Sequence, residues 1–146
     1  MKRRMFAAVM AAVFGALMGA GHAGEGGLRA SKPEVRKEVV AVIEAQLAAF
    51  RAGDVAKAYG YAAAPLRAQN PLRVFAAIVQ NNYREVWTST RAEYGLVRDD
   101  GQHAAVLVHV FAAASDAAYD YVLVKERAGW RIGSVVRHEA RKKSIL

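Results

Sequence analysis

The spacing of the apolar residues changes near residue 86, and this change constrains the fold more than any other feature. Before it, apolar residues recur every three or four positions, the period of a helix that buries one face. The first such stripe consists of Val35, Val39, Ile43, Leu47 and Phe50. After it, β-branched and aromatic residues dominate four segments, WTSTRAEYGLV, HAAVLVHVFAA, AYDYVLVKE and GWRIGSVVRHE. The segments are separated by the hairpin-type turns RDDGQ, ASDA and RAG. We therefore predict an α+β fold, with three N-terminal helices packed on one face of a four-stranded antiparallel sheet.

Capping residues predict where the first helix begins and ends. The stretch SKPE opens it, because Ser31 is able to cap the helix and Glu34 stands three residues further on, as in a capping box. Gly53 suits the left-handed position that ends a helix, and Asp54 suits the cap of the next one. A Gly-Asp pair is also conceivable as a phosphate or metal site, but nothing beside it supports that reading. We interpret residues 53–54 as a tight corner between two helices.

The second and third predicted helices are separated by prolines. Pro65 is expected to end the second helix, whose inner face includes Tyr59. Asn70 is expected to cap the third helix and Pro71 to occupy its first helical position. The apolar stripe of this third helix runs to Tyr83.

The two hairpin turns determine which strand residues share a face of the sheet. One turn is predicted at Ser115 and Asp116, and the other at Ala128 and Gly129. The side that faces the helices then holds Val106, Val108, Val110, Tyr119, Tyr121, Leu123, Trp130, Ile132 and Val136. The opposite side holds Leu107, His109, Phe111, Asp120, Val122, Val124 and Val135. That second side is too apolar for bare solvent, so we expect a second copy of the chain to cover it in part. A slip of one residue in either turn would exchange the two sides.

The N-terminus has the layout of a secretory signal peptide. The basic stretch MKRR is followed by an uncharged apolar run over residues 5–20 and by small residues at Gly21 and Ala23. The run is shorter than the roughly 20 residues that span a bilayer, so we favour cleavage after Ala23 over an uncleaved anchor. We expect a periplasmic or secreted protein with no stable membrane anchor. Residues 24–32 are expected to form a flexible lead-in, residues 33–139 a single domain, and residues 140–146 a basic tail.

Charge and composition exclude several kinds of site. The formal net charge is +8, and removal of the three bases within residues 1–23 lowers it to +5. The remaining basic residues gather near the C-terminus, where they face an anionic membrane surface or merely solvent; an exported protein rarely meets nucleic acid. The chain has no cysteine, which excludes disulfides, thiol nucleophiles and a lipid anchor on cysteine. Its 4 histidines are scattered, so we expect no metal site and no cofactor.

Three segments resemble an uncharacterised bacterial family, a domain of unknown function. They are VIEAQLAAFRAGDVAKAYGYAAAPLRAQ over residues 42–69, the helix around Phe75, and GWRIGSVV over residues 129–136. The order of helix, corner, helix, helix and meander is similar to the nuclear-transport-factor-two-like superfamily, which includes ketosteroid isomerase and scytalone dehydratase. The resemblance spans about residues 33–139. It implies a cone-like, cystatin-like architecture with a curved sheet, a pocket between the first helix and the concave sheet face, and frequent dimerisation through the sheet.

The candidate ligand-binding residues follow from that implied pocket. They are aromatic side chains: Tyr59, Tyr83, Tyr121 and Trp130. No Asp or Glu falls on the helix-facing side in the predicted register, so an isomerase-type site would lack its carboxylate base. His109 and Asp120 share the opposite face and form an alternative polar pair, more typical of an interface than of catalysis.

Three hypotheses of function follow. The first is an exported non-catalytic binding module that holds a small apolar or amphipathic molecule in its pocket. The second is an envelope interaction protein that acts through its dimer surface or basic tail. The third is a small lyase or isomerase. Pocket volume discriminates the first two, because an interior filled by its own aromatic side chains leaves no room for a ligand.

Overall fold

The computed structural model describes residues 27–138. The predicted signal peptide and basic tail lie outside the described residues. Within them, no helix combines the length and apolar character needed to cross a membrane. The predicted mixture of helices and antiparallel sheet is confirmed, although the elements are more numerous than expected.

Helices make up most of the chain between residues 33 and 87. They are α3 (Pro33–Arg51), α4 (Val55–Tyr59), α5 (Ala64–Gln69), α6 (Leu72–Asn82) and α7 (Arg84–Trp87). The prediction of three helices is therefore too low for this part of the chain. Pro65 lies in the first turn of α5, where a missing amide hydrogen costs nothing, so it begins a helix instead of ending one. The chain also forms one more helical turn, α7, where a strand was expected to begin.

The predicted corner between the first two helices is confirmed. Gly53 has a φ of 75°, the left-handed conformation that glycine adopts without steric cost. The side chain of Asp54 accepts a hydrogen bond of 3.1 Å from the backbone amide of Lys57 and so caps α4. The break in the helical sequence is thus a structural corner.

The two other predicted caps are wrong. Lys32 is the N-cap of α3 and makes no side-chain cap, while the hydroxyl of Ser31 donates to the carboxylate of Asp99. Asn70 ends α5, and its side-chain amide donates to the carbonyl of Leu66. Both side chains are able to cap a helix, but each bonds elsewhere: Ser31 to a residue distant in the sequence, and Asn70 to the helix that precedes it.

One antiparallel sheet contains all the described strands. They are β1 (Arg29–Ala30), β2 (Ser89–Tyr94), β3 (Arg98–Asp99), β4 (His103–Ala112), β5 (Asp116–Glu126) and β6 (Gly129–Arg137). The order is β1-β3-β4-β5-β6, and β2 pairs with the same edge of β4 as β3 does, further along. The four predicted strands correspond to β2, β4, β5 and β6. Two short strands are added, one of them within the stretch predicted as a flexible lead-in.

The β4–β5 hairpin turns two residues earlier than predicted. Val108 pairs with Tyr119 and Val110 with Ala117, because the chain reverses at residues 113–114. A shift by an even number of residues leaves every side chain on its original face. The predicted helix-facing residues of β4 and β5 are accordingly buried; they are Val106, Val108, Val110, Tyr119, Tyr121 and Leu123.

A bulge in β6 reverses one part of the predicted faces. Leu123 pairs with Ile132 but Val122 pairs with Ser134, so Gly133 is an extra residue in β6. Beyond the bulge Val135 faces the core, while Val136 is 38% exposed, the opposite of the prediction for both. We call the face turned away from the helices the outer sheet face; it carries Leu107, His109, Phe111, Asp120, Val124 and Val136.

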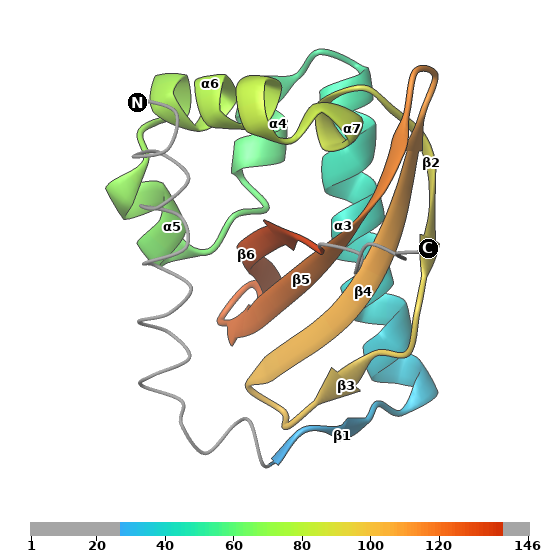
Figure 1. Ribbon diagram of the computed structural model, residues 1–146. Coiled ribbons are helices and arrows are strands. Elements are labelled where there is room, and N and C mark those ends of the chain that lie inside the picture. Colours follow the sequence, from blue (N-terminus) through green and yellow to red (C-terminus); the bar gives the residue numbers. More distant parts are fainter. Residues whose placement is uncertain (1–26, 139–146) are drawn as a thin grey trace.

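The core lies between this sheet and the helices. Figure 1 shows α3 behind β4 and β5, with α6 and α7 across one end of the sheet. Val39, Ile43 and Leu47 of α3 have no exposed surface and belong to the same apolar cluster as Tyr121 and Ile132. Burial of each such aliphatic side chain contributes about 1.5–3 kcal/mol, so α3 is a principal source of stability.

Candidate functional site

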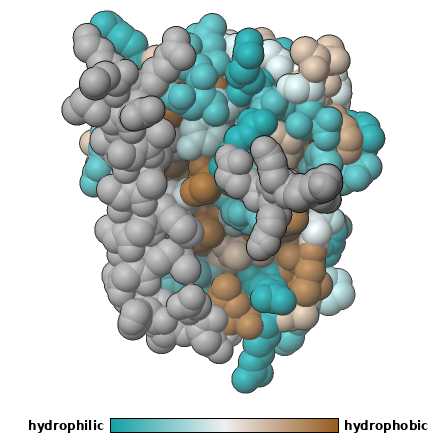
Figure 2. Space-filling model, in the orientation of Figure 1, coloured by the Kyte–Doolittle hydropathy of each residue, from teal (hydrophilic) through white to brown (hydrophobic). Residues whose placement is uncertain are grey.

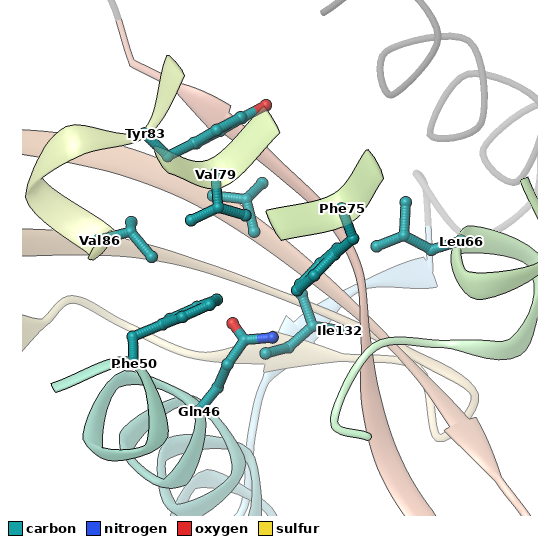
Figure 3. Close-up of a pocket in the computed structure, with 9 residues that line it drawn as sticks. Gln46, Phe50, Leu66, Phe75, Val79, Tyr83, Val86 and Ile132 are labelled. Carbon is teal, nitrogen blue, oxygen red and sulfur yellow. The ribbon is translucent and has the colours of Figure 1, made fainter. Parts of the chain in front are cut away.

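The predicted pocket between the helices and the sheet corresponds to a small cavity. Side chains of α3, α5, α6 and β6, with Tyr83 and Val86, surround it; they are Gln46, Phe50, Leu66, Phe75, Val79, Tyr83, Val86, Ile132 and Val135. Figure 3 shows Gln46 and Phe50 reaching from α3 toward Phe75 and Ile132. The cavity holds about 20 Å³, and one water molecule needs about 10–15 Å³ by the same measure.

One polar group in this lining, the amide nitrogen of Gln46, already has a hydrogen-bond partner. The amide nitrogen of Gln46, which is 3% exposed, donates to the carbonyl of Ala58 at 3.1 Å. The remaining lining is apolar apart from the hydroxyl of Tyr83, whose pKa burial raises to about 12. The interior, as it stands, lacks the room to hold a small organic molecule.

The four predicted pocket residues occupy different environments. Tyr83 lines the cavity. The hydroxyl of Tyr59 shares its one proton between the carbonyls of Arg67 at 2.9 Å and Asn70 at 2.8 Å, which closes the end of α5. Tyr121 and Trp130 are buried in the sheet core, and neither the Tyr121 hydroxyl nor the Trp130 indole nitrogen has a hydrogen-bond partner among the described residues. The structure thus brings one of the four to the cavity and uses the others in packing.

A buried carboxylate lies at the end of the sheet, where none was predicted. Glu85 of α7 is 3% exposed. It accepts hydrogen bonds from the hydroxyl of Ser115 at 2.6 Å, the hydroxyl of Tyr119 at 2.7 Å and the guanidinium of Arg137 at 2.9 Å. These partners come from the β4–β5 turn, β5 and the end of β6. We call these four residues the Glu85 cluster.

The Glu85 cluster is not suited to acid–base chemistry near neutral pH. Burial alone would raise the pKa of Glu85, but the bonds from Ser115, Tyr119 and Arg137 outweigh it and lower that pKa to about 2. Burial and the neighbouring Glu85 raise the pKa of Tyr119 above its ordinary value. The carboxylate therefore stays ionised and the phenol protonated, whereas a general base needs a pKa closer to the working pH.

The partners of Glu85 explain why sequence reasoning missed it. Ser115, Tyr119 and Arg137 follow it by 30, 34 and 52 positions. Residues 84–87 also lie where the apolar pattern changes from helix to strand, so the face of Glu85 could not be assigned. The local sequence contains no signal for this site.

The predicted pair of His109 and Asp120 does not form. Instead, His109 Nε2 lies 2.6 Å from Asp116 Oδ2, and Asp120 Oδ2 lies 3.0 Å from His138 Nδ1. The imidazole of His109 stacks on Phe111, with ring centroids 4.5 Å apart, and Arg91 lies over the same phenyl ring at 3.9 Å. His109, Phe111 and Arg91 form a partly exposed stacked group on the outer sheet face.

A second, larger hollow opens on the surface beside the Glu85 cluster. We call it the α7 groove; its lining comprises Gln80, Arg84, Trp87, Thr88, Ala112, Ala114 and Ser115. It holds about 440 Å³, within the range of about 300–1,000 Å³ that is usual for small-molecule sites. Within residues 27–138 no group of three or more side chains is arranged to bind a metal ion.

Comparison with known families gives one match. The model of DUF4864, a domain of unknown function, matches residues 32–145. Neither the curated proteins nor the solved structures contain a match to this chain.

Proposed function

The chain belongs to the DUF4864 family, a domain of unknown function, and we propose that it is an exported, non-catalytic module that acts through its surface as a homodimer. The small interior cavity supports this proposal most directly, because about 20 Å³ leaves no space for a ligand between helices and sheet. The hydrogen bonds of the Glu85 cluster favour a non-catalytic role as well, since they engage both oxygens of its carboxylate.

The outer sheet face supports association with a second copy. Leu107, in the middle of β4, is 41% exposed. Around it the face carries side chains of both signs, among them Arg91, Glu93 and Asp116. A surface with mixed charges can meet its own copy across a twofold axis, each basic group facing an acidic group of the partner. Figure 2, in the orientation of Figure 1, shows hydrophobic patches between hydrophilic ones on the surface.

We also propose that the chain has a nuclear-transport-factor-two-like fold and that it is exported. The order of a long helix, the corner at Gly53, shorter helices and an antiparallel meander supports a nuclear-transport-factor-two-like fold. The basic, apolar and small-residue layout of the N-terminus supports export to the periplasm or beyond.

A charge placed on the outer sheet face tests the dimer. Native mass spectrometry and light scattering are expected to give a dimer for the unaltered protein and a monomer for Leu107→Glu, because a dimer would bury the new carboxylate. Leu72→Glu is a matched control: Leu72, on α6, is 40% exposed, against 41% for Leu107, but lies on the helical side. A monomeric unaltered protein, or equal behaviour of the two variants, would rule out this interface.

A further inference from the structure

We propose that the α7 groove binds a small amphipathic anion that carries a hydroxyl or amide N–H group. This inference concerns a different surface from the proposed dimer interface and does not depend on it. The groove lies between α6 and α7 on one side and the β4–β5 turn on the other.

The groove is open because small side chains line its strand side. Ala112 and Ala114 contribute only methyl groups, and the indole of Trp87 supplies an apolar surface opposite them. Trp87 is held by a tilted contact with Phe50, with ring centroids 5.6 Å apart, so its position is set by the core. An apolar chain or ring fits a space with these walls.

Arg84 supplies the charge that selects an anion. Arg84 is exposed, and within residues 27–138 no carboxylate forms an ion pair with its guanidinium. None of the lining residues is acidic. Glu85, the next residue, is buried and neutralised by Arg137 at 2.9 Å, so the local balance in the groove is positive. A guanidinium binds carboxylate or phosphate oxygens through charged hydrogen bonds.

The hydroxyls of Thr88 and Ser115 favour a ligand that carries a hydrogen-bond donor. Ser115 gives its proton to Glu85 at 2.6 Å, and Thr88 gives its proton to the carbonyl of Arg84 at 2.8 Å. Each hydroxyl oxygen therefore presents its remaining lone pairs and acts as an acceptor. A hydroxyl or N–H group of the ligand would donate to these oxygens. The side-chain amide of Gln80 can donate to the anionic group of the ligand or accept from its hydroxyl or N–H group.

Three probes with the same chain length test this selection: hydroxydecanoate, decanoate and decanol, each kept below its micellar concentration. Amide chemical shifts of the purified protein are expected to move around Thr88, Ala114 and Ser115. Affinity should fall from hydroxydecanoate to decanoate to decanol. Equal binding of decanol and decanoate, shifts centred on the interior cavity, or no binding by hydroxydecanoate would each overturn the proposal.

Variants of exposed residues distinguish binding in the groove from nonspecific electrostatic attraction to the basic protein. Arg84→Gln is expected to weaken binding of hydroxydecanoate about tenfold, since one charged hydrogen bond is lost. Arg73→Gln removes an equal charge from the start of α6, outside the groove lining, and should leave binding unchanged. Ala114→Leu should abolish binding by filling the groove while thermal stability is retained. Equal affinity in Arg84→Gln and Arg73→Gln, or full binding by Ala114→Leu, would contradict the site.

Discussion

Glu85 and Arg137 stand 52 positions apart, yet their side chains meet at 2.9 Å and join α7 to the end of β6. The hydroxyl of Tyr119 contacts both, donating to Glu85 at 2.7 Å and accepting from Arg137 at 3.1 Å. Because the Glu85 side chain is 4% exposed and that of Arg137 is 47% exposed, the pair links the core to solvent. Loss of the buried Glu85 carboxylate should therefore lower the free energy of unfolding more than loss of the exposed Arg137 guanidinium.

The first prediction concerns Glu85→Gln. The amide keeps the shape but not the charge, so Arg137 loses its ion pair and one of the three donors meets an NH₂ group. Urea denaturation is expected to show a loss of about 2–3 kcal/mol in the free energy of unfolding. Glu93→Gln is the control, because Glu93 pairs with Arg91 on the surface and its side chain is 62% exposed; its cost should stay below about 1 kcal/mol. Equal losses in the two variants would contradict a structural role for the cluster.

The second prediction follows from the pKa of Glu85, which is lowered from 4.5 to about 2. A carboxyl group with a depressed pKa in the folded state stabilises the fold above its unfolded pKa. That contribution should disappear as the pH falls from about 5 toward 2. Denaturation at a series of pH values should therefore show a steep fall in this window, and Glu85→Gln should flatten it. An unchanged pH profile in the variant would assign the acid sensitivity to other carboxylates.

The third prediction compares two fully buried tyrosines of β5. The Tyr119 hydroxyl donates to Glu85, whereas the Tyr121 hydroxyl has no partner within the described residues. Tyr119→Phe should lower the free energy of unfolding by about 1–3 kcal/mol, because a buried acceptor loses its donor. Tyr121→Phe should be neutral or stabilising, because it removes an unsatisfied polar group. Thermal or chemical denaturation measures both, and a larger cost at Tyr121 would reveal an interaction of that hydroxyl.

The fourth prediction concerns the N-terminus. When the full chain is expressed in a host that exports proteins, N-terminal sequencing of the exported form should begin at Gly24. Substitution of Ala23 by a large residue, as in Ala23→Leu, should slow processing, because small residues precede signal cleavage sites. An exported protein that still begins at Met1 would refute the signal peptide.

Much of the fold could be predicted from local patterns. The alternation of apolar residues in β4 and β5 predicts their buried faces, and it does so despite a turn shifted by two residues, because the side-chain period of a strand is two. The same logic fails beyond Gly133, where one extra residue reverses the faces of Val135 and Val136. A glycine in a strand is compatible with a bulge but does not require one.

The candidate sites could be predicted only in part. Tyr83 was expected at the interior cavity and lies there, but the cavity volume depends on how completely Phe50, Phe75 and Ile132 fill the space. His109 and Asp120 were expected to lie together, but His109 contacts Asp116 and Asp120 contacts His138. The α7 groove combines residues of α6, α7 and the β4–β5 turn, so it has no counterpart in the linear sequence.

The amino-acid sequence by itself determined the α+β class and the corner at Gly53 and Asp54. Those features depend on backbone preferences and capping bonds within a few residues. Only the tertiary structure decided that the interior is nearly filled, that Glu85 is held by Ser115, Tyr119 and Arg137, and that a groove opens beside α7. These features arise from contacts between distant segments, whose geometry is set when helices and sheet pack together.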